Sequence, residues 1–240
     1  MKILITGASR GIGRAIALAA AKTGKYTHMH LTCRSSLRKL EELSLEIQKI
    51  NSDIIVTTSS GVISSVSDAQ AVREIFGPTD VIINNAAVSY TGPLIDMTEE
   101  MWNDTVSTNI SSLFYFYKAF LPDMIGRHSG QIINISSVWG NVGASCETIY
   151  SASKGAVNSF TKALAKELAP SGIQVNAVAF GMVDTEMNGH LTPEDIEVLK
   201  EEIPTGNIMT PEVAAEAVLK VLEMPLDMTG QIITVDGAWT

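Results

Sequence analysis

Tyr150 and Lys154 stand four positions apart in a helix-like segment, and Ser137 lies a short loop upstream. Positions four apart share one helix face, so a phenol and an ammonium would be neighbours. A nearby ammonium favours the phenolate and lowers the pKa of the tyrosine, which suits a proton donor and acceptor near neutral pH. With the Ser137 hydroxyl holding a carbonyl oxygen, the three side chains predict proton transfer on an alcohol or ketone, although this helical spacing also arises by chance.

A second group of residues has the form of a dinucleotide-binding turn, which would place a hydride source nearby. The segment Thr6–Gly13 (TGASRGIG) follows a strand-like run and opens a helix. Glycines let the backbone approach a pyrophosphate, and a helix N-terminus offers free N–H groups and a positive dipole end. A strand before and a helix after are the context that this motif requires. The expected cofactor contacts are Gly7, Ser9, Arg10, Gly11, Ile12 and Gly13.

The end of the second predicted strand indicates which dinucleotide is bound. An NAD site usually has a carboxylate there for the ribose 2′-hydroxyl. This chain has Cys33 and then Arg34, with Arg10 in the glycine turn. Two guanidinium groups suit a 2′-phosphate, which predicts NADP(H) rather than NAD(H). The alternative is that Arg34 is a solvated residue at a helix start. Cys33 has no local base and is expected to be inert.

These residues need a scaffold, and strand-like and helix-like runs alternate along the whole chain. Short runs that are apolar on both faces indicate buried parallel strands. With right-handed crossovers they predict an α/β fold: a Rossmann-like, doubly wound parallel sheet of about seven strands with helices on both faces, a three-layer sandwich. No linker or repeat interrupts 1–240, so we expect a single domain. The expected strands are Ile3–Thr6, His28–Thr32, Ile54–Thr57, Val81–Asn84, Gln131–Ile135, Gln174–Ala177 and Ile232–Val235, and the expected helices are Ile12–Lys22, Leu37–Ile50, Asp68–Phe76, Glu99–Met124, Tyr150–Ala169 and Pro211–Leu222.

Composition and charge make several classes of binding partner unlikely. The net charge of −9 and the lack of basic runs disfavour nucleic acid and anionic membranes. Cys33 and Cys146 lack metal-ligand spacing, so we expect no metal, and no signal peptide or membrane-spanning run is visible, which predicts a cytoplasmic protein. The run Leu113–Tyr117 is apolar almost all round its helix, as is the helix after Tyr150. A homo-oligomer, tetramer or dimer, would bury the extra surface, and a thick core is the alternative.

Several of these motifs occur together in one known family. Thr6–Gly13, Asn84-Asn85-Ala86, Asn109, Ser137, Tyr150 and Lys154 resemble the pattern of the classical short-chain dehydrogenases/reductases, in the right order over essentially the whole chain. The segments Ile135–Gly140 and Gly181–Thr185 are closest in character to bacterial 3-oxoacyl-(acyl-carrier-protein) reductases and their paralogues. The resemblance implies an NADP(H)-dependent oxidoreductase (EC 1.1.1-type), with fatty acid biosynthesis as the expected context.

The resemblance also implies roles for single residues. Tyr150 would be the general acid in carbonyl reduction, Lys154 would lower its pKa and hold the nicotinamide ribose, and Ser137 would polarise the carbonyl. Asn109 would hold a water in a proton relay; the alternative is a side chain–backbone bond that bends its helix. The remaining expected cofactor contacts are Asn85 and Ala86 beneath the adenosine ribose and Gly181, Val183 and Thr185 at the nicotinamide carboxamide.

The chain departs from the family pattern at three places. Ala87 replaces a glycine after Asn85-Ala86, so a methyl group stands where the backbone approaches the cofactor. Phe180 replaces a proline before Gly181, and it is a candidate to line the nicotinamide pocket. The usual adenine-binding aspartate after the third strand is missing, because Gly61-Val62 or Ser65-Val66 occupies that place.

The expected substrate pocket is covered by a lid over 187–209, whose turn residues flank a short helix. Trp139, Met182 and Met187 would make the pocket apolar, unless Trp139 packs into its own loop.

Three functions remain open: reduction of a 3-oxoacyl group on an acyl-carrier protein, reduction or oxidation of another small carbonyl or alcohol, and a non-catalytic NADP(H) sensor. The four intact residues Asn109, Ser137, Tyr150 and Lys154 argue against the sensor. An acidic carrier protein would favour basic residues at the site mouth, for which Arg127 and His128 are the candidates, whereas Ser171 stands where the family often has an arginine.

Overall fold

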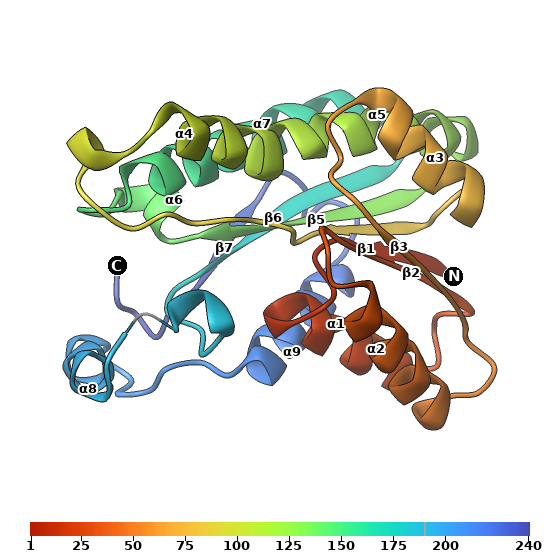
Figure 1. The fold of residues 1–240 in the computed structure, drawn as a ribbon. Helices are drawn as coiled ribbons and strands as arrows, with labels where there is room; N and C mark the ends of the chain where they lie inside the picture. Colours follow the sequence, from red (N-terminus) through yellow and green to blue (C-terminus); the bar gives the residue numbers. More distant parts are fainter. Residues whose placement is uncertain (190) are drawn as a thin grey trace.

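Seven parallel strands form one sheet in the order β3-β2-β1-β4-β5-β6-β7 (Figure 1). The computed structural model describes residues 1–189 and 191–240. Helices lie on both faces, so the predicted doubly wound α/β sandwich is confirmed, and the strand bounds differ from the predicted ones by up to three residues. The strands are β1 Lys2–Ile5, β2 His28–Cys33, β3 Ile55–Ser60, β4 Val81–Asn84, β5 Gly130–Ser137, β6 Ile173–Phe180 and β7 Ile232–Val235.

The two faces of the sheet carry separate hydrophobic cores. On one face, α1 (Gly11–Lys22), α2 (Leu37–Ile50) and α9 (Pro211–Leu222) pack through side chains such as Ile16, Leu43 and Val218. On the other, α3 (Val66–Phe76), α5 (Ser112–Arg127) and α7 (Thr148–Leu168) pack through side chains such as Phe120 and Leu164. Because both faces are covered, every residue of β4 and β6 is buried, which explains why most of their residues are apolar.

The strand order reverses between β1 and β4, and this reversal sets the position of the site. Loops that leave neighbouring strands toward opposite faces open a crevice beyond the carboxyl ends of the strands, where ligands of such sheets bind. The loops after β1, β2, β4, β5 and β6 all meet at this edge. The edge strands β3 and β7 are partly exposed and contribute less to the core.

The prediction of one continuous helix over Glu99–Met124 is wrong, because the α-helix is interrupted in the middle of this range. The structure has α4 (Glu99–Val106), then a π-helical segment Ser107–Ser111, then α5. Asn109 lies in the π segment. Its side chain does not face solvent but hydrogen-bonds the backbone of Val88. A π bulge inserts one extra residue into a helix and commonly marks a functional site. A periodic apolar pattern does not reveal such an insertion.

The aromatic run of α5 is largely absorbed by the core. Leu113, Phe116 and Tyr117 are buried, whereas Phe114 is 47% exposed. A thick core therefore accounts for most of the run, and one aromatic side chain is left on the surface.

The segment predicted as a lid contains α8 (Pro193–Glu202). A capping box starts this helix, because Thr192 accepts from the Asp195 backbone while the Asp195 side chain accepts from the Thr192 backbone. No residue of α8 is fully buried, so it lies on the outside of the molecule. Residue 190, which belongs to the predicted lid, lies outside the described residues.

Candidate active site

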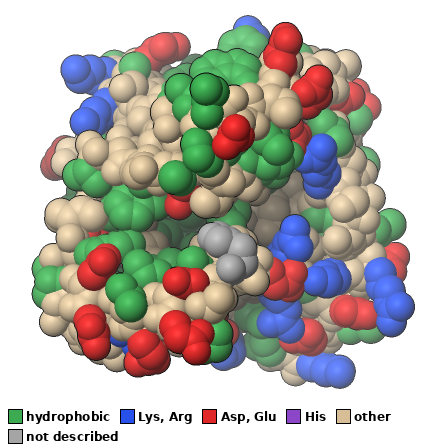
Figure 2. Space-filling view, turned by 60° about the vertical axis from the view of Figure 1, so that its left-hand side comes forward, with side chains coloured by type: hydrophobic (Ala, Val, Ile, Leu, Met, Phe, Trp, Pro, Cys, Tyr) green, Lys and Arg blue, Asp and Glu red, His purple; other side chains and the backbone are tan. Residues whose placement is uncertain are grey.

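A cleft of about 670 Å³ runs along the carboxyl ends of the strands, within the usual range for small-molecule sites. Figure 2 shows a hollow in this face, with hydrophobic side chains on one side of it and Lys and Arg side chains on the other. Of the residues predicted to form the site, all line the cleft except Gly13 and Asn109. The predicted residues that line it are Gly7, Ser9, Arg10, Gly11, Ile12, Cys33, Arg34, Asn85, Ala86, Ser137, Trp139, Tyr150, Lys154, Gly181, Met182, Val183, Thr185 and Met187.

The glycine turn is packed tightly beneath the loop that follows β4. A Cβ atom on Gly13 would lie 2.5 Å from both Asn85 Nδ2 and Gly7 O, a separation that no side chain can occupy. Asn85 Nδ2 donates to Thr6 O at 3.0 Å and to Gly7 O at 3.1 Å, which fixes the turn from the other side. Gly13 therefore does not line the cleft. Because it has no side chain, the glycine turn and the loop after β4 can pack against each other.

The N-terminus of α1 fits a phosphate group. Its N-cap residue Arg10 makes no side-chain cap hydrogen bond, and no acidic residue occupies the first turn. The amide groups of that turn and the positive end of the helix dipole are thus available to an anion in the cleft. The phosphate-binding role of this turn stays a prediction, which the available amide groups favour.

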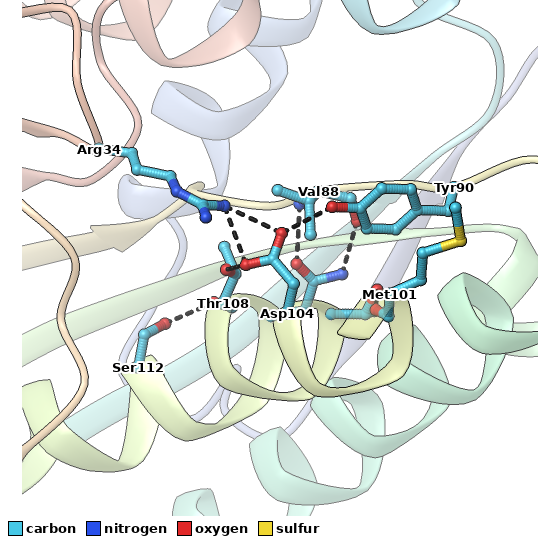
Figure 3. A network of polar contacts seen from close by, with 9 residues as sticks. Arg34, Val88, Tyr90, Met101, Asp104, Thr108 and Ser112 are labelled. Carbon is cyan, nitrogen blue, oxygen red and sulfur yellow. Dashed lines mark hydrogen bonds and ion pairs between the residues drawn. The ribbon is translucent and has the colours of Figure 1, made fainter. Parts of the chain in front are cut away.

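Both arginines predicted near a 2′-phosphate line the cleft, but each also holds a carboxylate. Arg34 Nη1 donates to both oxygens of Asp104 at 2.9 Å, and Tyr90 Oη donates to the same carboxylate at 2.8 Å (Figure 3). Although partial burial works the other way, hydrogen bonds from Arg34 and Tyr90 hold the pKa of Asp104 below its ordinary value. Arg34 is thus neither free nor simply solvated.

Arg10 is engaged in the same way by a different carboxylate. Its Nη1 donates to Glu186 Oε2 at 2.9 Å, and Lys39 Nζ donates to Glu186 Oε1 at 3.2 Å. All three side chains are about half exposed, so the pairs are weak and exchangeable. A phosphate can therefore compete with the two carboxylates for the guanidinium groups. Sequence reasoning missed Asp104 and Glu186, because neither is adjacent to its arginine in the chain.

Cys33 ends β2 and is 5% exposed. Burial raises the pKa of its thiol, which opposes formation of a thiolate. The structure therefore agrees with the prediction that this cysteine is chemically inert.

Tyr150 and Lys154 lie on one face of α7, toward the end of β5 that carries Ser137. Lys154 Nζ lies 5.5 Å from the centre of the Tyr150 ring and donates to Ile135 O at 2.8 Å. Burial lowers the pKa of Lys154 to about 8. The buried ammonium is therefore closer to losing its proton at neutral pH than a lysine on the surface.

The expected lowering of the tyrosine pKa is not what the structure shows. Burial, and then the carboxylate of Glu147, raise the pKa of Tyr150, and hydrogen bonding with Ser137 only partly opposes them. The sequence prediction considered the ammonium of Lys154 alone and omitted the cost of desolvating a phenolate. The phenol consequently stays protonated at neutral pH, which is the form that donates a proton.

Asn109 does not line the cleft, and its side chain is already engaged. Its Oδ1 accepts from Val88 N at 2.8 Å, and its Nδ2 donates to Val88 O at 2.9 Å and to Ser153 Oγ at 3.0 Å. The residue therefore ties the loop after β4 to α7, next to Tyr150. Its expected water-holding role stays a prediction.

The three departures from the family pattern also have places in the structure. Ala87 lines the cleft, and Phe180 lines it while being only 3% exposed. Neither Gly61 nor Val62 after β3 is among the cleft-lining residues. Ser65 is instead the N-cap of α3, so an adenine contact from this region is not supported.

The other end of the cleft is apolar. Trp139 follows Ser137 on the short helix α6 (Trp139–Val142) and lines the cleft, and its contact with substrate stays a prediction. Met182 and Met187 join it as predicted, and Leu191, Leu199 and Trp239 were not predicted. Trp239 is the penultimate residue of the sequence, where no local motif indicated a site.

Comparison with known proteins identifies the class of protein that this fold and cleft define. Residues 1–196 match the family described as short chain dehydrogenase, and the chain belongs to this oxidoreductase family. It is 39% identical over 238 residues to the uncharacterized oxidoreductase YmfI of Bacillus subtilis, with 98% of this chain and 97% of that protein covered. It is 34% identical over 235 residues to the 3-oxoacyl-(acyl-carrier-protein) reductase FabG of Pseudomonas aeruginosa, with 98% and 95% covered.

A solved structure supports the same assignment. A variant of actinorhodin polyketide ketoreductase, solved with NADPH, superimposes with a TM-score of 0.90 at 32% identity, covering 99% of this chain and 96% of that one.

The described residues contain neither a metal-binding cluster nor a membrane-spanning helix. Within 1–189 and 191–240, no group of His, Cys, Asp and Glu side chains is arranged to hold a metal ion. In the same part of the chain, no helix has the length and hydropathy needed to cross a bilayer.

Proposed function

We propose that this protein reduces a ketone to a secondary alcohol with NADP(H) as the cofactor. The observation that carries the proposal is the convergence of Ser137, Tyr150 and Lys154 on one cleft with the glycine turn at its other end. NADPH supplies the hydride when it is bound. The rest of the chemistry is proton transfer and positioning by side chains of this chain.

Tyr150 donates its phenolic proton to the carbonyl oxygen as negative charge develops there. The high pKa of this phenol keeps the proton in place at neutral pH until the oxygen becomes basic enough to take it. Ser137 donates a hydrogen bond to the same oxygen and holds it against Tyr150. Lys154 places positive charge beside the phenol, which stabilises the phenolate left after transfer.

The cofactor is held by the glycine turn and by the loops after β2, β4 and β6. The α1 N-terminus would bind the pyrophosphate, Asn85 and Ala86 would contact the adenosine ribose, and Gly181, Val183 and Thr185 would hold the carboxamide end. Arg10 and Arg34 would bind the 2′-phosphate in place of their carboxylate partners. The related polyketide ketoreductase was solved with NADPH, which supports the same choice here.

The first candidate substrate is a 3-oxoacyl thioester, because relatives in several bacteria are named 3-oxoacyl-(acyl-carrier-protein) reductases. Under this candidate the protein acts in fatty acid biosynthesis, in the cytoplasm, as a homotetramer or homodimer. The half-exposed Phe114 on α5 supports contact with a second copy.

The second candidate is a small carbonyl compound that no carrier protein delivers, and two observations favour it. Arg127 and His128 precede β5, at the edge of the sheet opposite the cleft, so they are not at the site mouth as predicted. Arg127 is also engaged there by Thr79 O and Asp80. The lid helix α8 instead presents Glu194, Asp195, Glu197, Glu201 and Glu202, which would repel an acidic carrier.

Oxidation of NADPH with an acetoacetyl thioester and with a panel of free ketones tests the proposal. The parent protein should turn over at least one of them. Tyr150→Phe should keep NADPH binding and lower kcat at least about a hundredfold, the usual size of a general-acid contribution. Tight NADPH binding with no turnover of any carbonyl would favour the sensor, and full activity of Tyr150→Phe would exclude the proton-donor role.

A further inference from the structure

The final residues of the chain fold back onto the carbonyl end of the cleft. Trp239 lines the same cleft as Ser137 and Tyr150. Its ring centre lies 4.9 Å from that of Trp139, with the two planes at 60°, an edge-to-face pair. The backbone N–H of Trp139 in turn donates to Ser137 Oγ at 3.2 Å. The aromatic pair is therefore connected, through the backbone of Trp139, to the Ser137 hydroxyl, which is proposed to hold the carbonyl oxygen.

A compact turn fixes the position of Trp239. Asp236 Oδ1 accepts from Ala238 N at 2.9 Å, and Asp236 Oδ2 accepts from Thr240 N at 2.9 Å and Thr240 Oγ1 at 3.1 Å. Ala238 has a φ of 65°, a left-handed conformation that costs energy in a residue with a side chain. The hydrogen bonds on both sides of Trp239 hold this strained turn and so fix the backbone from which its side chain projects.

The same turn is packed between the cofactor loop and the end of the lid. A Cβ atom on Gly181 would lie 2.8 Å from Asp236 Cβ. A Cβ atom on Gly237 would lie 2.4 Å from Thr205 Oγ1 and 2.8 Å from Ile203 Cγ2. The tail thus contacts both the loop expected to bind nicotinamide and the residues that follow α8. Trp239 is held on two sides by elements of the site.

The surroundings of the aromatic pair define the kind of group that would fit against it. The lining of the same cleft includes the apolar side chains of Met182, Met187, Leu191 and Leu199 and the carboxylates of Glu147 and Glu186. Among the described lining residues, the basic side chains are Arg10, Arg34 and Lys154. The arginines belong to the predicted cofactor half, and Lys154 Nζ is bonded to Ile135 O. An uncharged, flat group suits this environment better than an anionic one.

We infer that Trp139 and Trp239 form an aromatic wall that selects ketones carrying a flat ring or conjugated group next to the carbonyl. The inference rests on the proposed function, because Ser137 and Tyr150 fix the carbonyl beside the wall. A planar substituent gains edge or face contact with the two indoles, while a small alkyl group touches less of them. Trp239 is therefore a specificity-determining residue, supplied by the segment that follows β7.

Two esters that differ only at the group beside the ketone test the inference: ethyl 3-oxobutanoate, with a methyl, and ethyl 3-oxo-3-phenylpropanoate, with a phenyl. The measured quantity is the ratio of their kcat/KM values with NADPH, in which any loss of folded protein cancels. Trp239→Leu should lower the phenyl-to-methyl ratio about tenfold, and Trp239→Phe should restore most of it. Trp102→Ala removes a half-exposed tryptophan on α4 and is the matched control, with a ratio like that of the parent. An unchanged ratio in Trp239→Leu overturns the inference, as does an equal fall in Trp102→Ala.

A binding measurement separates this inference from the proposed function. If the parent reduces neither these esters nor any other ketone, the proposed function fails, and isothermal titration of the phenyl ester into the complex with NADP⁺ decides the inference. Trp239→Leu should then weaken the Kd of the phenyl ester about tenfold, with Trp239→Phe close to the parent. An equal Kd in parent and Trp239→Leu, or no binding to the parent, overturns the aromatic wall.

Discussion

Replacing Lys154 by Met should lower the activity sharply and make the protein more stable at neutral pH. The size of this stability difference should depend on pH. Burial lowers the pKa of Lys154 from 10.5 to about 8. At ~1.36 kcal/mol for each pKa unit, this shift corresponds to about 3 kcal/mol, the cost of keeping the buried side chain charged at neutral pH. Methionine has a similar length and no charge, so Lys154→Met removes this cost. It also removes the hydrogen bond to Ile135 O, which contributes ~2 kcal/mol for a charged donor. The variant should therefore be about 1 kcal/mol more stable than the parent at pH 7.

The pH dependence of this stability difference tests the reasoning more strictly than its value at pH 7. A folded-state pKa below the unfolded one means that the unfolded chain holds more protons between pH 8 and 10.5. The free energy of unfolding of the parent therefore rises with pH through this window, by about 3 kcal/mol, while Lys154→Met lacks this rise. The stability of the variant minus that of the parent should fall by the same amount and change sign, because other titrating groups cancel in the difference.

Urea unfolding at fixed protein concentration, at pH 7, 8, 9 and 10.5, measures this difference. Lys162→Met, on the exposed side of the same helix, removes a solvated lysine and serves as the control. A difference that stays constant to within about 1 kcal/mol across the window would refute the reasoning, because the charge of Lys154 would then cost nothing in the fold. Carbonyl reduction by Lys154→Met should fall sharply at every pH, since the proposed mechanism uses its charge.

Three further substitutions test the cofactor half of the cleft. Cys33→Asp should lower the NADPH-to-NADH ratio of kcat/KM at least about tenfold by repelling the 2′-phosphate, and an unchanged ratio would place Cys33 away from that phosphate. Asp104→Asn should free Arg34 and lower KM for NADPH about two- to fivefold, with NADH unaffected; a higher KM would mean that Asp104 positions the guanidinium instead of competing for it. Gly13→Ala should weaken NADPH binding and lower Tm, because the new Cβ would lie 2.5 Å from Asn85 Nδ2. A parent-like Kd and Tm would contradict the close packing of the two loops.

Much of this protein could be predicted from local sequence because local rules govern those parts. Short apolar runs such as Val81–Asn84 must be buried strands, and their alternation with helices leaves a doubly wound sheet as the consistent fold. The glycine turn is equally local: a strand, a tight turn and a helix start follow one another without interruption, so an anion-binding role could be predicted from neighbouring residues alone. Tyr150 and Lys154 share a helix, so their common face followed from spacing alone.

The tertiary structure decided what depends on residues far apart in the chain. Asp104 reaches Arg34 across 70 positions and Glu186 reaches Arg10 across 176, so the state of both arginines was invisible to sequence patterns. The π segment at Asn109 depends on a bond to Val88 in another loop.

The sequence by itself determined the class of chemistry, because a phenol, an ammonium, a hydroxyl and a glycine turn have meanings that hold in any such fold. Only the tertiary structure decided how each group behaves. Burial, which no residue type specifies, raises the pKa of Tyr150 and lowers that of Lys154. The turn that follows β7 brings Trp239 to Trp139, one hundred positions earlier, and so forms an aromatic pair in the cleft. Chemical type is local to a residue, whereas solvation and contact are properties of the whole fold.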